Sequence, residues 1–251
     1  MSEKFKEIIE KKESVPFEAD MRVDFFRHGK VNYTAEELAS AKYEGQLGDV
    51  GRKQVEAGAQ KLAQSIDRER ELVVLWASPR QRAQESAEII AEILKAENIG
   101  VIQKLGKKDI RKIGALRDVG LSPEFMKAKG PDRDWMEFWD KADNLPESTE
   151  APESLKERSL RILAYLEKIS RLISPPADKK LHFICVGHEE SFKELLSEGF
   201  GQGVEKESRP ANAETMRLDI FHSGAKPEFR LKYRDEEADL KFDSAERKIY
   251  K

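Results

Sequence analysis

Residues 22–29 read RVDFFRHG, a short apolar run that ends directly in arginine, histidine and glycine. Runs of this kind, rich in Val and Phe, are typical of buried β-strands. Two further runs have the same form, because residues 72–82 read LVVLWASPRQR and residues 181–189 read LHFICVGHE. Each run predicts a strand that is followed at once by basic or imidazole side chains.

Stretches of helical periodicity separate these strands. Apolar residues recur at spacings of three and four over residues 51–66, 81–96 and 154–173, and a further helix is expected over 190–200. Alternation of strands and helices indicates an α/β fold, with a mostly parallel central sheet and helices on both faces.

Two segments near the C-terminus alternate apolar and charged residues. Residues 215–221 read TMRLDIF, and Phe229, Leu231 and Tyr233 alternate in the same way. The first segment predicts an antiparallel strand, because alternation with a period of two indicates a strand with one buried face.

The chain is expected to form one main domain over residues 21–234. Residues 1–20 predict an N-terminal extension that includes a short amphipathic helix over 4–13. Residues 104–150 show little apolar periodicity and begin with a basic cluster over 104–117, which favours a cap-like insertion. Residues 235–251 are of mixed charge and are expected to form a charged C-terminal tail. The aromatic core of the cap is expected to consist of Trp135, Phe138 and Trp139.

The composition excludes several classes of protein. Of 251 residues, 45 are Lys or Arg and 48 are Asp or Glu, so a net charge of −3 gives no basic field for nucleic-acid binding. No apolar run approaches the roughly 18 residues of a membrane span. The single cysteine, Cys185, excludes an internal disulfide and a cysteine-based zinc site. The polar N-terminus is unlike a secretory signal, so we expect a cytoplasmic protein.

The residues after the three strands suit a phosphate ligand. Ligands of open α/β sheets bind beyond the carboxyl ends of the strands, where Arg27, His28, Arg82 and His188 are expected to meet. Guanidinium groups bind phosphate oxygens through paired, charge-assisted hydrogen bonds. Neutral imidazole is in addition a nucleophile, so this set can both bind a phosphate and react with it.

Five segments occur in an order that a known family shares. They are Arg27-His28-Gly29, LGDVGRKQ at 47–54, ASPRQRAQESA at 77–87, Pro152-Glu153-Ser154 and Gly187-His188. Together they resemble the motifs of the histidine phosphatase superfamily, also called phosphoglycerate mutase-like. The resemblance covers most of the chain, from residue 21 to about residue 220, and implies the fold of that superfamily.

The resemblance implies a mechanism and assigns roles. His28 would attack phosphorus and form a covalent phosphohistidine, which water then hydrolyses. Arg27, Arg82 and His188 would surround the phosphoryl oxygens and stabilise their charge, so neither a metal nor a cofactor is expected. A bound dianion should raise the pKa of His188 and so favour its imidazolium form. Residues expected to contact the substrate are Gly29, Asn32 and Asn212.

Two residues are candidates for the general acid that protonates the leaving group. Asp118, in the string Ala-Leu-Arg-Asp, occupies the place where family members often have Glu, although its side chain is one methylene shorter. Glu189 directly follows the second histidine, where another branch of the superfamily carries its acid. Arg80 has no role in the family and is interpreted as part of a surface salt bridge.

These features predict a phosphomonoesterase, that is, a histidine acid phosphatase-type hydrolase. Its partner would be a small phosphorylated metabolite or a phosphoprotein. The alternatives are a phosphoglycerate mutase and a protein that binds phosphorylated ligands without turnover. The mutase is disfavoured because residues 30–33 read KVNY, which departs from the extended mutase signature after RHG. The oligomeric state is not readable from the sequence.

Overall fold

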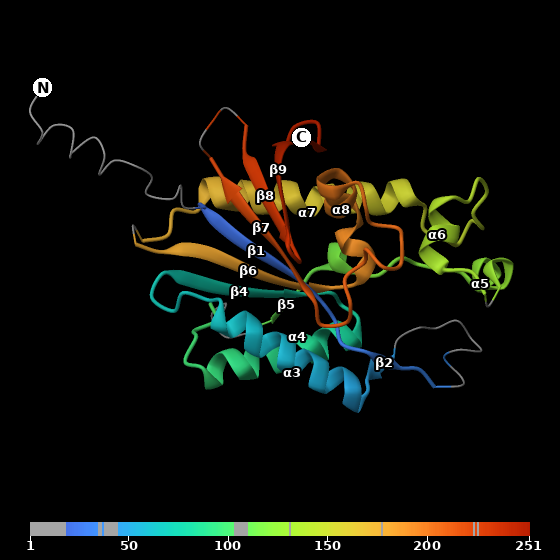
Figure 1. The fold of residues 1–251 in the computed structure, drawn as a ribbon, viewed down its shortest axis with the longest axis horizontal. Coiled ribbons are helices and arrows are strands. Elements are labelled where there is room, and N and C mark those ends of the chain that lie inside the picture. The colour runs from blue at the N-terminus through green and yellow to red at the C-terminus, as the bar shows by residue number, and fades with distance from the viewer. Residues whose placement is uncertain are drawn as a thin grey trace, which may run out of the picture.

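A computed structural model describes residues 19–34, 37, 45–102, 110–130, 132–176, 178–222, 224 and 226–251. Its centre is an eight-stranded sheet in the order β10-β9-β8-β7-β1-β6-β4-β5 (Figure 1). The strands of this sheet are β1 (Met21–Arg27), β4 (Glu71–Ala77), β5 (Ile110–Lys112), β6 (Lys180–Gly187), β7 (Thr215–Phe221), β8 (Glu228–Tyr233), β9 (Glu236–Asp243) and β10 (Lys248–Tyr250). Two short strands, β2 (Val31–Asn32) and β3 (Gln46–Leu47), pair separately.

The sheet is parallel in one half and antiparallel in the other. β6 lies between β1 and β4 and is parallel to both, and β5 extends this half beyond β4. β7 pairs with β1 in the antiparallel sense, and β8, β9 and β10 continue that pattern. The predicted α/β fold is therefore confirmed. Its central sheet, predicted to be mostly parallel, is mixed: it is parallel from β1 through β6 and β4 to β5 and antiparallel from β1 through β7 to β10. The antiparallel strand predicted over residues 215–221 is confirmed as β7.

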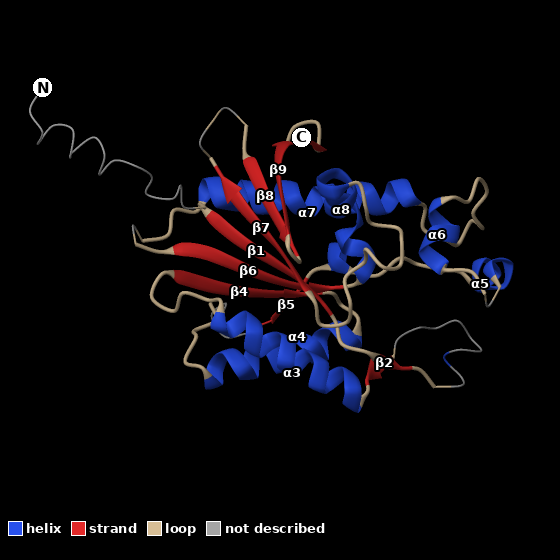
Figure 2. Cartoon of the chain, viewed as in Figure 1, coloured by secondary structure: helices blue, strands red, loops and turns tan. Residues whose placement is uncertain are grey.

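Helices cover both faces of the sheet (Figure 2). On one face lie α3 (Asp49–Gln64) and α4 (Gln81–Ala96), and on the other lie α7 (Pro152–Leu172) and α8 (Lys193–Phe200). Successive side chains of β6 point to opposite faces of the sheet, so they pack into different helical layers. Phe183 and Cys185 pack in the core beneath α7 and α8, whereas Ile184 and Val186 pack in the core beneath α3 and α4.

The segment predicted as a cap forms two short helices, α5 (Pro123–Lys129) and α6 (Trp135–Asp140). They lie beyond the end of the sheet toward which β1 runs (Figure 1). Phe125, Met136 and Trp139 are fully buried in a small core of their own, which Leu155 of α7 completes. The predicted insertion begins too early, because Ile110–Lys112 forms β5 and pairs with Leu75–Ala77 of β4.

The prediction of a charged C-terminal tail over residues 235–251 is wrong. Residues 236–243 and 248–250 form β9 and β10, and together they add two strands to the sheet. Leu240, Phe242 and Ile249 point into the core beneath α7 and α8, while the charged residues between them face solvent. The helix predicted over residues 4–13 lies outside the described residues, as do residues 104–109 of the predicted cap.

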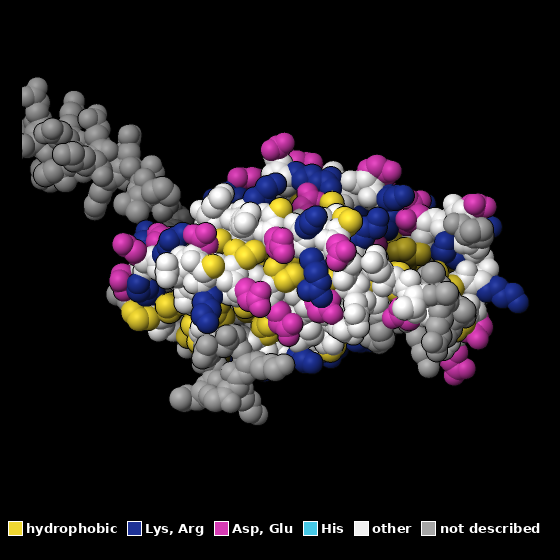
Figure 3. Space-filling model, turned by 90° about the horizontal axis from the view of Figure 1, so that it is seen from below, with side chains coloured by type: hydrophobic (Ala, Val, Ile, Leu, Met, Phe, Trp, Pro, Cys, Tyr) yellow, Lys and Arg dark blue, Asp and Glu magenta, His cyan; other side chains and the backbone are white. Residues whose placement is uncertain are grey.

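Charges of both signs are interspersed on the surface. Figure 3 shows Lys and Arg side chains mixed with Asp and Glu side chains over the face seen from below, on which α3 and α4 lie. Within the part of the chain that the structure describes, no helix has the length and apolar character to cross a membrane.

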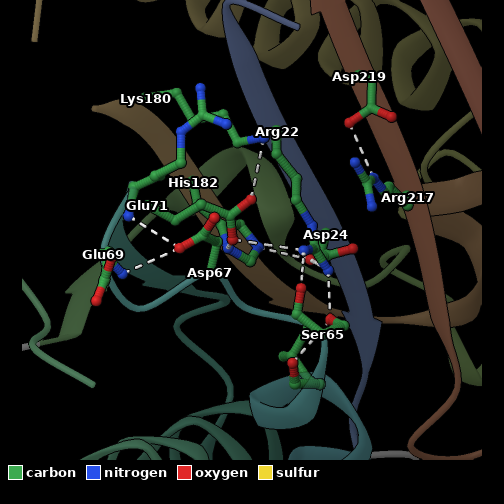
Figure 4. Close-up of polar contacts among 12 residues, drawn as sticks. Arg22, Asp24, Ser65, Asp67, Glu69, Glu71, Lys180, His182, Arg217 and Asp219 are labelled. Carbon is green, nitrogen blue, oxygen red and sulfur yellow. Dashed lines mark hydrogen bonds and ion pairs between the residues drawn. The ribbon is translucent and has the colours of Figure 1, made fainter. Parts of the chain in front are cut away.

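A buried ionic cluster joins β1, β4 and β6 on the face of the sheet that carries α3 (Figure 4). His182 binds two carboxylates, with Nε2 2.5 Å from Oδ2 of Asp24 and Nδ1 3.0 Å from Oε2 of Glu71. Arg22 lies 2.8 Å from Asp24 and donates to the Ser65 carbonyl at the C-terminal end of α3. Both ring nitrogens of His182 thus face acceptors, which requires the imidazolium form.

His182, Asp24 and Glu71 in this cluster have shifted pKa values. Burial opposes the protonation of His182, but the Asp24 and Glu71 carboxylates outweigh burial and raise its pKa. Burial likewise opposes ionisation of Glu71, but His182 and Arg22 lower its pKa to about 2. The cluster explains why Arg22, Asp24 and His182 occur in strands that are otherwise apolar, and it gives His182 a structural role.

Candidate active site

The carboxyl ends of β1, β6 and β4 lie side by side and open into one cavity. Arg27 of β1 lies beside Gly187 of β6 in the strand register, and the His28 N–H donates to the Gly187 carbonyl over 3.1 Å. The cavity has a volume of about 490 Å³. It is lined by Arg27, His28, Tyr33, Arg80, Arg82, Asp118, Val119, Gly120, Leu121, Met126, Trp135, His188, Glu189 and Glu190. Six of the predicted site residues therefore meet here.

His28 is held in a single tautomer. Its Nδ1 lies 2.7 Å from the carbonyl oxygen of Gly29, which only accepts hydrogen bonds, so Nδ1 carries the proton. Its Nε2 lies 3.2 Å from Nε of Arg82, which only donates, so Nε2 presents a lone pair. Burial, reinforced by the positive charge of Arg82, lowers the pKa of His28 to about 3. The imidazole is therefore neutral and nucleophilic at Nε2.

Arg82 connects His28 with Asp118. Arg82 lies in the first turn of α4, is 4% exposed, and places Nη2 2.6 Å from Oδ2 of Asp118. Arg80 places Nε 2.6 Å from Oδ1 of the same carboxylate. Asp118 thus accepts a charge-assisted hydrogen bond on each oxygen and holds both arginines at the cavity wall. Arg80 was predicted to form a surface salt bridge; its ion pair is instead part of this cavity.

His188 faces His28 across the cavity, with the ring centroids 5.0 Å apart. Its Nε2 lies 2.8 Å from the Ser78 hydroxyl, and its buried Nδ1 has no partner among the described residues. Burial, together with the neighbouring His28 ring and the positive charge of Arg82, holds the pKa of His188 well below its ordinary value. A phosphate dianion between the two rings would supply the missing negative charge and raise this pKa.

Arg27 and Glu189 form an ion pair on the opposite wall. Nη1 of Arg27 lies 2.8 Å from Oε2 of Glu189, and it also donates to the Pro210 carbonyl. The other carboxylate oxygen of Glu189 accepts from Nε1 of Trp135 over 3.1 Å and lies 3.6 Å from Nη1 of Arg209. Glu189 therefore links the strand end to α6, and both its oxygens have donors.

Glu190 is a site residue that the sequence analysis did not select. It is 4% exposed and lines the cavity, and its Oε1 accepts from the Val119 N–H over 2.8 Å. Burial, together with the negative charges of Glu189 and Asp118, raises the pKa of Glu190 to about 7. A carboxyl group with this pKa carries a proton for a large fraction of the time near neutral pH.

Three residues predicted to contact the substrate do not line the cavity. Gly29 lies behind His28, where a Cβ would come within 2.3 Å of the Gly51 carbonyl oxygen in α3. Asn212 donates from Nδ2 to the His28 carbonyl over 3.1 Å, so it supports the backbone from the far side. Asn32 is exposed on β2, beside β3. Gly29 and Asn212 position His28 rather than touch the cavity.

The apolar wall of the cavity was also missed as a binding surface. Trp135 packs against the cap core, as predicted, and in addition lines the cavity together with Tyr33, Leu121 and Met126. Trp135 lies on the same short helix as the buried Met136 and Trp139, so the sequence pattern did not indicate that its side chain also faces the cavity. Across the described residues, no group of three or more His, Cys, Asp or Glu side chains is arranged to hold a metal ion.

Comparison with known families gives one match that covers most of the chain. The family model of the histidine phosphatase superfamily (branch 1) matches residues 23–230. The matched range includes every residue that lines the cavity. No curated protein matches the sequence at a significant level.

Solved structures with a similar fold include several phosphatases. Mycobacterial hydrolase 1 is 20% identical, with a TM-score of 0.57 over 86% of this chain and 99% of its own. A mycobacterial glucosyl-3-phosphoglycerate phosphatase is 18% identical, with a TM-score of 0.55 over 85% of this chain and 98% of its own. A putative α-ribazole-5′-P phosphatase from Escherichia coli is 16% identical, with a TM-score of 0.55 over 86% and 96%. At these identities the likeness concerns the fold.

Proposed function

Because the chain belongs to the histidine phosphatase superfamily, we propose that it is a phosphomonoesterase that works through a phosphohistidine on His28. The observation that carries the proposal is the fixed tautomer of His28. Nδ1–H is bound to the Gly29 carbonyl, and the Nε2 lone pair belongs to a ring that lines a cavity rich in cationic donors. That is the state in which imidazole attacks phosphorus.

The first half-reaction moves the phosphoryl group to the enzyme. As Nε2 bonds to phosphorus and the ester P–O bond breaks, the Nε–H of Arg82 leaves Nε2 and donates to a phosphoryl oxygen. Arg27 and His188 bind further oxygens as negative charge spreads over them. The Nδ1–H of the phosphorylated ring keeps the Gly29 carbonyl as its acceptor throughout.

The second half-reaction returns the enzyme to its starting state. Water attacks phosphorus opposite Nε2, the P–N bond breaks, and its electron pair returns to Nε2 as the lone pair. Inorganic phosphate then leaves. All positive charge that this cycle requires comes from side chains of the cavity, so the proposed mechanism routes no step through a metal ion.

The shape of the cavity favours a small phosphorylated metabolite over a folded phosphoprotein. A volume of about 490 Å³ is in the range of small-molecule sites. Arg80 and Arg82 supply charged lining to the cavity, whereas Leu121, Met126 and Trp135 supply apolar lining. A phosphate group therefore fits the strand ends while an apolar or flat moiety packs on the cap. The phosphatase names of the structural neighbours agree with this substrate class.

The test is hydrolysis of 4-nitrophenyl phosphate by the full chain in the presence of a chelator. We expect turnover by the wild type, none by His28→Ala, and a phosphoryl group on the peptide that contains His28 after rapid acid-free quenching. Release of inorganic phosphate distinguishes hydrolysis from mutase activity, in which the group passes to a second phosphorylated metabolite. Turnover by His28→Ala, or phosphate binding by the wild type without turnover, would refute the proposal.

A further inference from the structure

Three carboxyl groups line the cavity, and they differ in whether they can hold a proton. They belong to Asp118, Glu189 and Glu190. Departure of an alkoxide from phosphorus requires a proton donor, and a carboxyl group near the leaving oxygen is a common source. The contacts of each carboxyl group show which of the three can act as the proton donor.

Asp118 and Glu189 both bind arginines through their carboxyl oxygens. The two oxygens of Asp118 lie 2.6 Å from Arg80 and 2.6 Å from Arg82. Oε2 of Glu189 lies 2.8 Å from Arg27, and its Oε1 accepts from the indole of Trp135. A proton on either group would replace a charge-assisted hydrogen bond to a guanidinium, which is among the stronger polar contacts in proteins.

Glu190 has a different environment. Within the described ranges it makes no ion pair, and its hydrogen bonds come from backbone N–H groups, that of Val119 to Oε1 and its own. The charged groups that face it are the carboxylates of Glu189 and Asp118 and the guanidinium of Arg158 on α7. Arg158 is bound to Glu150 through Nε at 3.1 Å and Nη2 at 3.0 Å, so its charge is balanced elsewhere.

On these contacts we propose that Glu190 is the general acid, and that Asp118 and Glu189 instead hold the arginines that bind phosphate. The inference rests on the proposed phosphatase function. Because Oε1 already accepts from Val119, the proton belongs on Oε2. A pKa of Glu190 raised to about 7 agrees with this assignment, and a bound phosphate dianion raises it further.

Glu190 both donates a proton and takes one back in the course of the cycle. In the first step, Oε2–H of Glu190 passes its proton to the ester oxygen as the P–O bond breaks, and a neutral alcohol leaves. Glu190 is then a carboxylate. In the second step it takes a proton from the attacking water as the new P–O bond forms, and Oε2–H is restored.

The test compares two leaving groups of similar shape in the full-length protein. Benzyl phosphate releases a strongly basic alkoxide, whereas 4-nitrophenyl phosphate releases a weak base that needs no proton. We expect Glu190→Gln to lower kcat/KM for benzyl phosphate by about 10²–10⁴-fold and for 4-nitrophenyl phosphate by less than about tenfold. The activity of the wild type toward benzyl phosphate should decline above neutral pH as Glu190 loses its proton, and this decline should be absent in Glu190→Gln.

Matched variants separate this role from a structural one. Asp118→Asn and Glu189→Gln should lower kcat/KM for both substrates by similar factors, because both weaken phosphate binding. Glu194→Gln removes a carboxylate of α8 that is 5% exposed and lies outside the cavity, and it should leave the ratio of the two rates unchanged. Equal losses on both substrates in Glu190→Gln would overturn the inference. A loss confined to benzyl phosphate in Asp118→Asn or Glu189→Gln would transfer the role to that residue.

A spectroscopic readout is independent of turnover. Infrared difference spectra between pH 6 and pH 8 should contain a protonated-carboxyl band that is lost in Glu190→Gln and retained in Glu189→Gln. A band that survives in Glu190→Gln would overturn the inference even if activity falls. By contrast, activity in His28→Ala would refute the phosphatase proposal itself, so the two failures are distinguishable.

Discussion

The Nε–H of Arg82 donates a hydrogen bond to Nε2 of His28 across 3.2 Å. Arg82, which is proposed to bind the phosphate, therefore occupies the lone pair with which His28 is proposed to attack phosphorus. This contact keeps the ring in its reactive tautomer. It also means that catalysis requires an exchange, in which Arg82 gives up His28 and takes a phosphoryl oxygen. The carboxylate of Asp118 stays bound to Nη2 during that exchange and fixes the direction of the guanidinium.

Replacing Arg82 by Lys should remove this geometry while keeping the charge. An ammonium group cannot contact His28, Asp118 and a phosphoryl oxygen from one rigid plane. We expect kcat/KM for 4-nitrophenyl phosphate to fall by about 10²-fold or more. Arg68→Lys serves as control, because Arg68 is exposed and pairs only with Glu97 in the described structure. Near-wild-type activity in Arg82→Lys would show that charge alone suffices.

The lowered pKa of His28 predicts a loss of stability in acid. His28 has a pKa of about 3 in the fold and about 6.5 when unfolded, so the unfolded chain binds more protons between these values. Stability therefore falls as the pH drops below about 6.5, by roughly 2 kcal/mol at pH 5 from this group. Urea unfolding at pH 7 and pH 5 should show a smaller decrease for His28→Asn than for the wild type.

The buried cluster around His182 predicts the opposite dependence. The pKa of His182 is raised in the fold, so its contribution to stability is complete below pH about 6.5 and is lost as the pH rises through the raised value. His182→Gln removes one of the two buried cations, His182 and Arg22, that Asp24 and Glu71 share, and should cost about 3–5 kcal/mol. Unfolding measurements should show a larger cost at pH 6 than at pH 9, and kcat of the folded variant should be unchanged.

Gly29→Ala tests the packing behind the nucleophile. The added Cβ would lie 2.3 Å from the backbone oxygen of Gly51, so β1 and α3 must move apart. Overpacking of this kind costs about 1–3 kcal/mol, and the shift would move the carbonyl that holds His28. We expect lower stability together with a lower kcat. Gly100→Ala meets nothing within 4 Å and is the matched control. A fully active Gly29→Ala would contradict the described packing.

Truncation after Arg234 tests whether β9 and β10 belong to the fold. Leu240, Phe242 and Ile249 are at most 4% exposed in the core, and their removal uncovers Phe229 and Leu231. Loss of these buried side chains should leave the truncated chain aggregated or unable to unfold cooperatively, as judged by circular dichroism and gel filtration. A soluble and cooperative truncated protein would restore the interpretation of these residues as a tail.

The convergence of Arg27, His28, Arg82 and His188 was predictable because each lies just after a strand or at the start of the helix that follows. The three apolar runs specify the parallel strands, and parallel strands bring their carboxyl ends to one edge. The amphipathic stretch over residues 81–96 then fixes the first turn of α4, which carries Arg82. Local patterns therefore sufficed for this part of the site.

Other features depend on contacts that no local pattern encodes. β9 reads EEADLKFD and has two buried apolar positions, too few to distinguish a strand from a charged tail. The protonation of Glu190 arises from burial against a segment some 70 positions earlier in the chain. Likewise, the ion pair between Arg80 and Asp118 forms only when the chain after β5 brings Asp118 next to the start of α4. These residues need the tertiary structure to be recognised.

The two ends of the strand order, β5 and β10, have a bearing on how the protein behaves at high concentration. Each is three residues long, and they read Ile-Arg-Lys and Lys-Ile-Tyr. An outermost strand displays unpaired backbone groups to other molecules, and brevity and positive charge are two ways in which proteins discourage such pairing. Both end strands combine these two features, which disfavours pairing of a neighbouring molecule with β5 or β10.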